Sequence, residues 1–218
     1  MVISRVFSES GMCRIFGYGE DAFTLWVLKQ KISDIVESFK DKTDPSDCLI
    51  FYRPSFGRRS RKDSSVFGEF DAIIVSLENV YLIESKWDNL GEFDNEKIAL
   101  RIEQRLRHKI FSWYLVHWRK KYSKKWEAFK EEHQHVFHKK FKRKTIAPAG
   151  SLLARNLESI LTKTTEHCRK LSEDNIKNVM LFFYNKDKST PPAKINRTFK
   201  LIPIDYSKQI KDNFIILE

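Results

Sequence analysis

The chain has 218 residues and a formal net charge of +11, and 41% of its residues are hydrophobic and 13% aromatic. This composition can build a sizeable core, so it excludes disorder over the whole length, and the length fits one domain. The longest strongly apolar run, residues 179–184, is far shorter than the roughly 20 residues that span a bilayer, so we expect no membrane partner.

The cysteines and the N-terminal residues indicate the compartment. Cys13, Cys48 and Cys168 are odd in number and widely spaced, which is typical of reduced thiols inside a cell. The first residues lack the long apolar run of a signal peptide. We therefore expect a soluble intracellular protein, cytoplasmic or nucleoid-associated.

The first half of the chain predicts one helix followed by three strands. Residues 1–18 show no clear pattern. Apolar residues at three- and four-residue steps predict a one-sided helix over residues 20–39. Short apolar runs then predict strands at residues 48–52, 66–75 and 80–86, with a polar, Arg-rich connection between the first two.

The second half predicts mainly helices, followed by strands. Pro148 and Gly150 mark a break within it. A basic helical region at about residues 113–171 is a candidate added lobe of the single domain, 1–218. The predicted helices are residues 96–122, 124–142 and 152–171, and the predicted strands are residues 179–184, 199–204 and 214–217.

The most informative pattern lies at the ends of two apolar runs. Asp71 begins the run that ends at residue 75, and Glu84 and Lys86 end the next run, two positions apart and so on one face of a strand. Two carboxylates and an ammonium at the end of a buried hairpin cost free energy, which a divalent metal ion with a water would offset. The alternative is a surface hairpin with an ordinary salt bridge.

This pattern resembles the PD-(D/E)xK nuclease superfamily, whose members carry an Asp on one strand and Glu-x-Lys on the next. Phe70 stands where the superfamily's Pro would be, and the resemblance covers only about residues 19–113. It does not identify a particular family within the group. It implies a restriction-endonuclease-like αβββαβ core of α/β class, with a mixed central sheet flanked by helices.

The resemblance also implies a site. Asp71, Glu84 and the backbone carbonyl of Ser85 would hold Mg²⁺, for which Mn²⁺ would substitute, because hard oxygen ligands suit this ion. Lys86 would orient or deprotonate the attacking water, or stabilise charge at phosphorus. The alternative for Asp71 alone is an acid that forms a hydrogen bond within its own turn.

Two further residues match positions that relatives use. Glu20 begins the first predicted helix, where a Glu supports the metal or a water in many relatives; acids also favour this position because of the helix dipole. Gln104 is a possible accessory residue, and surface polarity explains it equally well. His108 lies one turn further, between Arg105 and Arg107, and one of these three could meet the scissile phosphate.

The positive charge is concentrated in one stretch. Residues 119–144 contain eleven Lys or Arg and three Glu, which favours a polyanionic partner, with nucleic acid first and an anionic membrane second. The alternative is a solvated helix face. His133, His135 and His138 fit a basic surface better than a zinc site, because only the last two share a helix face. The candidate DNA-binding residues are Arg58, Arg59, Lys139, Lys140, Lys142 and Arg143.

These observations lead to one expected function and two alternatives. We expect a Mg²⁺-dependent DNA endonuclease working in defence, repair or mobile-element biology, and the resemblance makes a homodimer plausible. Hydrolysis would proceed by in-line attack of a metal-activated water. The alternatives are a nucleic-acid-binding module that keeps the fold without cleaving, and an RNA-directed nuclease.

Overall fold

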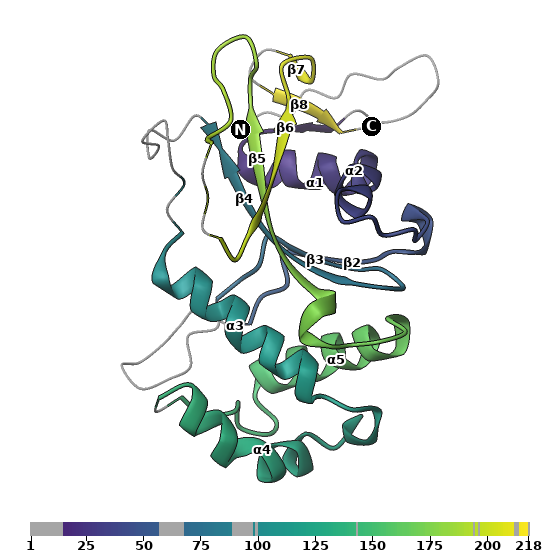
Figure 1. Ribbon diagram of the computed structural model, residues 1–218, viewed down its shortest axis with the longest axis vertical. Coiled ribbons are helices and arrows are strands. Elements are labelled where there is room, and N and C mark those ends of the chain that lie inside the picture. Colours follow the sequence, from purple (N-terminus) through teal and green to yellow (C-terminus); the bar gives the residue numbers. More distant parts are fainter. Residues whose placement is uncertain are drawn as a thin grey trace.

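A computed structural model describes residues 15–56, 68–88, 98, 100–142, 144–193, 195, 197–211 and 214–217. Helices and strands are mixed along the chain (Figure 1). The α-helices are α1 (Glu20–Gln30), α2 (Ile32–Ser38), α3 (Ile102–His117), α4 (Trp126–Lys140) and α5 (Leu152–His167), with short 3-10 turns η1 (Pro45–Asp47), η3 (Lys120–Tyr122) and η4 (Glu173–Asn175). The strands are β1 (Ile15–Gly17), β2 (Leu49–Tyr52), β3 (Ala72–Val75), β4 (Val80–Trp87), β5 (Ile176–Tyr184), β6 (Lys200–Asp205), β7 (Ile210–Lys211) and β8 (Phe214–Leu217).

A five-stranded mixed sheet forms the centre of the molecule, in the order β2-β3-β4-β5-β6. The β2–β3 and β3–β4 pairs are antiparallel, whereas the β4–β5 and β5–β6 pairs are parallel. Parallel neighbours need a long crossover, and α3, α4 and α5 lie within the connection from β4 to β5. The predicted α/β class, with a mixed sheet flanked by helices, is therefore confirmed.

The two faces of the sheet have separate cores. Alternate residues of β3 and β4 point to opposite faces, so Ile73 and Leu82 join a cluster with α3, α4 and α5. Ile74 and Ile83 join a second cluster, which α1, α2 and β8 cover. In Figure 1, α1 and α2 lie on one side of the sheet and the other three helices on the opposite side. Polar residues lie near the ends of β3 and β4.

An aromatic cluster fills the layer between α3 and α4. Phe129 is fully buried and its ring contacts those of Trp113, Trp118 and Trp126. This cluster is continuous with the apolar residues of β3 and β4. The basic helical region therefore shares a core with the sheet.

The predicted helices are shorter in the structure. Residues 20–39 form two helices, because Lys31 adopts a non-helical backbone conformation between α1 and α2. The helix predicted at residues 96–122 is α3, which starts at Ile102 and stops before Trp118, where the backbone becomes extended. The apolar spacing continues beyond both breaks, so periodicity alone could not place these ends.

The strands differ in a similar way. β3 begins at Ala72, because Gly68 has a positive φ and Glu69 forms only an isolated bridge with Ser55. β5 begins at Ile176, earlier than predicted. β1 and β7 were not predicted; they flank β8 in a second, three-stranded sheet.

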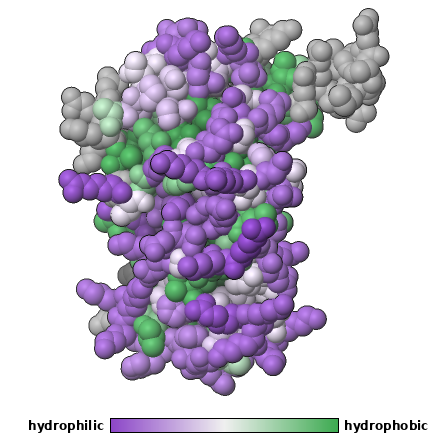
Figure 2. Space-filling model, turned by 45° about the vertical axis from the view of Figure 1, so that its right-hand side comes forward, coloured by the Kyte–Doolittle hydropathy of each residue, from purple (hydrophilic) through white to green (hydrophobic). Residues whose placement is uncertain are grey.

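Hydrophilic side chains cover most of the helical half on the face shown in Figure 2, with small apolar patches between them. Within the part of the chain that the structure describes, no helix combines the length and apolar character needed to cross a membrane.

Candidate active site

Antiparallel pairing of β3 with β4 places the two predicted acids opposite each other. Ala72 pairs with Ile83, so the next step of the register sets Asp71 across from Glu84. Both acids line one pocket of about 290 Å³ together with Lys86 and with Glu20 at the start of α1. The other lining residues are Arg53, Gly68, Glu69, Gln104 and Arg107. The structure thus brings together the four residues predicted for the site, which are Glu20, Asp71, Glu84 and Lys86.

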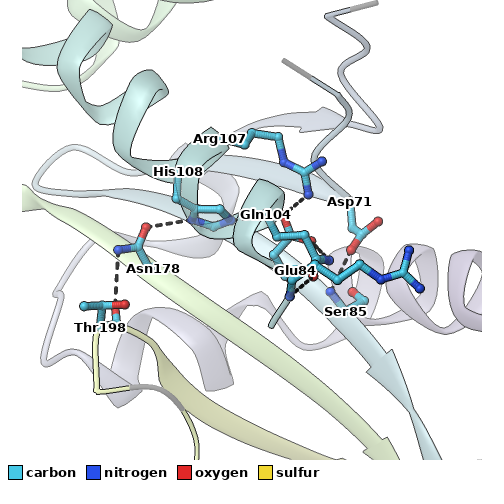
Figure 3. A network of polar contacts seen from close by, with 9 residues as sticks. Asp71, Glu84, Ser85, Gln104, Arg107, His108, Asn178 and Thr198 are labelled. Carbon is cyan, nitrogen blue, oxygen red and sulfur yellow. Dashed lines mark hydrogen bonds and ion pairs between the residues drawn. The ribbon is translucent and has the colours of Figure 1, made fainter. Parts of the chain in front are cut away.

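Glu84 is 2% exposed and is held by three side chains of α3 (Figure 3). Gln104 donates to its Oε2 at 3.0 Å, while Arg107 and His108 contact its Oε1, His108 at 3.0 Å. Burial alone would raise the pKa of Glu84, but the hydrogen bond from His108 and the charge of Arg107 outweigh burial and lower it. Glu84 therefore stays ionised deep in the site.

Asp71 is in the opposite electrostatic situation. Its Oδ2 accepts a hydrogen bond from the backbone N–H of Ser85 at 2.7 Å. Burial raises the pKa of Asp71 to about 7, and the neighbouring Glu84 carboxylate adds to the rise, against the Ser85 hydrogen bond. A carboxyl that titrates near neutral pH beside an ionised one is typical of functional sites.

Ser85 links the site to α1. Its side chain points to the opposite face from Glu84 and Lys86, and its Oγ lies 2.8 Å from Thr24 Oγ1. Thr24 also donates to the carbonyl of Glu20 at 2.8 Å. The backbone carbonyl of Ser85 remains a predicted metal ligand. The backbone N–H of Ser85 holds Asp71 in place.

Glu20 at the start of α1 and Lys86 on β4 both line the pocket. Oε2 of Glu20 is buried and has no hydrogen-bond partner among the described residues. Burial raises the pKa of Glu20, while the nearby Lys86 ammonium opposes the rise. An unpartnered carboxylate oxygen in a pocket of acids is a group that a cation or a water would satisfy.

Gln104 occupies the place predicted for an accessory residue. Besides donating to Glu84, it accepts a hydrogen bond from the Arg101 backbone N–H at 3.1 Å, which fixes its amide at the start of α3. The sequence alone does not show which of Arg105, Arg107 and His108 reaches the site. The structure places Arg107 and His108 on Glu84.

A chain of hydrogen bonds also holds His108 through Nδ1, the ring nitrogen that does not contact Glu84. Its Nδ1 lies 2.7 Å from Asn178 Oδ1 on β5, and Asn178 Nδ2 donates to the Thr198 carbonyl at 3.2 Å (Figure 3). Asn178 therefore presents its oxygen to the ring, while Glu84 presents a carboxylate oxygen to Nε2. Each ring nitrogen of His108 therefore has an oxygen partner.

The Arg107 side chain lies against the ring of Phe70 and next to Gly68. Its guanidinium lies 5.1 Å from the ring centroid of Phe70. A Cβ at Gly68 would come within 2.7 Å of an Arg107 nitrogen, and Gly68 also has φ +75°. The positive φ favours glycine at this position, and a side chain there would displace the Arg107 guanidinium.

Arg53 and Asn178 are site residues that the sequence analysis missed. Arg53 pairs with Glu69 at 3.1 Å and also with Asp21, which ties β2 to the start of α1. Both residues come from segments far from the Asp and Glu-x-Lys pattern. No local spacing signal identifies them.

The predicted DNA-binding residues are only partly described. Arg58, Arg59 and Arg143 lie outside the described residues. Lys139 is exposed near the end of α4, whereas Lys140 and Lys142 line a second hollow. His133 packs against Phe129 and Trp113 in the aromatic cluster.

The carboxylate oxygens that line the pocket are the type of ligand that a hard divalent cation prefers. Glu20, Asp71 and Glu84 offer only carboxylate oxygens, and Glu20 retains a buried unpartnered one. Burial raises the pKa of both Glu20 and Asp71, and the charge of Glu84 adds to the rise in each. Arg107 and His108 occupy one oxygen of Glu84, and the described residues include no group of three or more acids, His or Cys close enough to hold a metal ion.

Comparisons of the chain with family models, with curated proteins and with solved structures found no match.

Proposed function

We propose that the protein is a metal-dependent endonuclease that hydrolyses DNA phosphodiester bonds. The observation that carries the proposal is the pocket in which Asp71 lies opposite Glu84, with Lys86 beside them. The PD-(D/E)xK superfamily, which the chain resembles, uses these residue types in this order along the chain. The basic charge of the molecule suits the same substrate.

Asp71, Glu84 and the Ser85 carbonyl are the proposed metal-holding groups, with Glu20 in support. Mg²⁺, or Mn²⁺ in its place, would stabilise negative charge on a phosphate oxygen and lower the pKa of a water. Glu84 would exchange its contact with Arg107 for the ion. Gln104 would keep the Glu84 carboxylate in position through Oε2 during that exchange.

Lys86 and Arg107 are the cationic groups that would meet the substrate. Lys86 would orient the attacking water or stabilise charge at phosphorus, and Arg107, once released from Glu84, would pair with a phosphate oxygen. Both line the pocket. Arg107 also lies over the Phe70 ring, with 5.1 Å between its guanidinium carbon and the ring centroid.

A nucleic-acid-binding module without cleavage is the second candidate. Its supporting observation is that Glu84 already receives three donors from α3. A carboxylate with this many partners serves equally well to lock α3 onto the sheet. The two candidates differ in one outcome, which is whether divalent ions switch on hydrolysis.

The test is a cleavage assay on purified protein. Plasmid, linear duplex, single-stranded and branched DNA, and RNA of the same sequence, would each be incubated with Mg²⁺, Mn²⁺ or EDTA. The proposal predicts DNA cleavage with either metal ion and none in EDTA, with Asp71→Asn and Glu84→Gln inactive. Asp187→Asn and Glu166→Gln, exposed acids outside the pocket, are matched controls that should cleave normally. Tight DNA binding without cleavage would favour the second candidate, and cleavage of RNA alone would change the substrate.

A further inference from the structure

The hollow that Lys140 and Lys142 line lies on the other side of α3 from the carboxylate pocket. It measures about 710 Å³ and is bounded by α3, the end of α4 and the start of β5. On α3, Lys109 and Trp113 line this hollow, whereas Gln104 and Arg107 line the carboxylate pocket. At 3.6 residues per turn, these two pairs fall on nearly opposite sides of the helix.

Four lysines from two segments surround this hollow. Lys109 comes from α3, and Lys140, Lys142 and Lys144 come from the end of α4 and the residues after it. None of the four forms an ion pair with any residue that the structure describes, and Glu173 is the one acid in the lining. The rim therefore carries a net positive charge that favours an anionic ligand.

The floor of the hollow is apolar. It is formed by Leu106, Trp113, Phe141 and Ile176, which belong to the core or pack against it. A second hollow of about 370 Å³ shares Leu106, Lys109 and Asn178 with the first and adds Arg105 and Phe199. The two hollows together form one basic-rimmed groove along α3, which we call the α3 groove.

We propose that the α3 groove binds an unpaired strand of nucleic acid, with phosphates on the lysines and bases against the apolar floor. Single-strand sites combine a cationic track with apolar or aromatic surface that accepts bases. A duplex hides its bases and presents phosphates on a convex surface, so an apolar floor would gain nothing from it. The groove would hold a strand whether or not the carboxylate pocket cleaves.

Binding in EDTA tests this proposal separately from cleavage. Fluorescence anisotropy would follow a labelled oligothymidylate of about 20 nucleotides, longer than the ~4–16 that one OB-fold site covers. A duplex of the same length is the competitor. Wild type should prefer the single strand at every salt concentration.

Neutralising the rim should remove this binding. The fourfold variant changes Lys109, Lys140, Lys142 and Lys144 to Gln, and the matched control changes four exposed lysines elsewhere, Lys42, Lys163, Lys170 and Lys188. The rim variant should lose at least about tenfold in affinity, and its log-log salt dependence should flatten by about 0.7 for each lost phosphate contact. The control should lose far less. Equal losses in the two variants would overturn the proposal, because they would indicate net charge alone.

A second pair of variants tests the groove interior. Ser112 lines the larger hollow and is only partly exposed, so Ser112→Glu places a carboxylate inside it while Ser112→Gln adds the same bulk without charge. Glu should weaken single-strand binding at least about fivefold relative to Gln, because it repels phosphate. Equal binding by both, or a wild-type preference for duplex, would contradict a strand in the groove.

Discussion

The carboxyl group of Asp71 has a folded-state pKa of about 7, above its ordinary value of 3.8. Between these values the folded state holds a proton that the unfolded state has released, so stability without metal falls as pH rises and levels off above about pH 7. Asp71→Asn keeps an oxygen for the Ser85 N–H and removes the charge. This variant should therefore exceed wild type in stability by more at pH 8 than at pH 4.5.

The difference between the two pH values should be of the order of 3 kcal/mol, from ~1.4 kcal/mol per pKa unit. Urea unfolding in EDTA at both values measures it, with Asp187→Asn as a control that should show no such pH effect. A stability gain that is equal at both pH values would mean that folding does not raise the pKa of Asp71.

Arg107 holds the oxygen of Glu84 that a cation would need. Arg107→Met keeps much of the side chain over Phe70, removes a positive charge from the pocket and leaves His108 as the one remaining partner of that oxygen among the described residues. Mn²⁺ affinity, measured by calorimetry, should rise about tenfold, because a repelling charge is removed and competition for the Glu84 oxygen is reduced. Arg155→Met, at an exposed position on α5, is the control. Unchanged or weaker Mn²⁺ binding would place the ion away from Glu84.

At this scale, sequence spacing identified the residues that lie close together in the chain. Asp71, Glu84 and Lys86 follow from strand alternation and from hairpin pairing, and Gln104 follows from its place after the Glu-x-Lys strand. Helical spacing could not choose between Arg107 and His108, since both contact Glu84 from adjacent positions. Arg53 and Asn178 reach the site only through the β2–β3 and β4–β5 pairings, which a single sequence does not specify.

At the scale of elements, Asp41 connects the end of α2 to the turn between β3 and β4. This buried carboxylate accepts hydrogen bonds from Ser76, Asn79 and Tyr81 at 2.5, 2.8 and 2.6 Å and from the Thr43 N–H at 2.9 Å. Burial opposes its ionisation, yet these bonds lower the pKa of Asp41 well below its usual range. The stability that they contribute is present above about pH 4 and is lost as pH falls below it.

Asp41→Ala should cost roughly 3–5 kcal/mol at neutral pH, because it leaves several buried donors without an acceptor. Tyr81→Phe removes one of these bonds and should cost about 1–2 kcal/mol. Urea unfolding at neutral and acidic pH measures both losses. A cost for Asp41→Ala below that of Tyr81→Phe would contradict the role given to this carboxylate.

The order of elements was predictable from apolar periodicity, but several boundaries were not. Breaks at Lys31 and Trp118 depend on backbone conformations that no helix-breaking residue announces. The short strand β1 pairs with β8 from the other end of the chain, so local patterns do not show its partner, whereas β7 pairs with β8 locally but has only two residues, too few to form a pattern.

At the scale of the whole molecule, one core runs from the sheet through α3 to α4 and α5. The sequence could suggest an added lobe from its charge, but not that aromatic residues would join it to the sheet. Three of the five tryptophans, Trp113, Trp118 and Trp126, lie in the helical layer, so tryptophan fluorescence reports mainly on it, while far-ultraviolet circular dichroism reports on all elements. We predict coincident urea transitions for the two signals, as expected for one cooperative unit. Earlier loss of the fluorescence signal would show that the helical region unfolds alone.

The measurement that tests the central claim most directly is the single-turnover rate of plasmid cleavage at saturating Mg²⁺. It compares wild type with Asp71→Asn, Glu84→Gln and the double variant. If the two carboxylates act as one site, each single variant should lose at least about 100-fold and the double variant little more. Cleavage by Glu84→Gln at the wild-type rate would contradict the proposed active site.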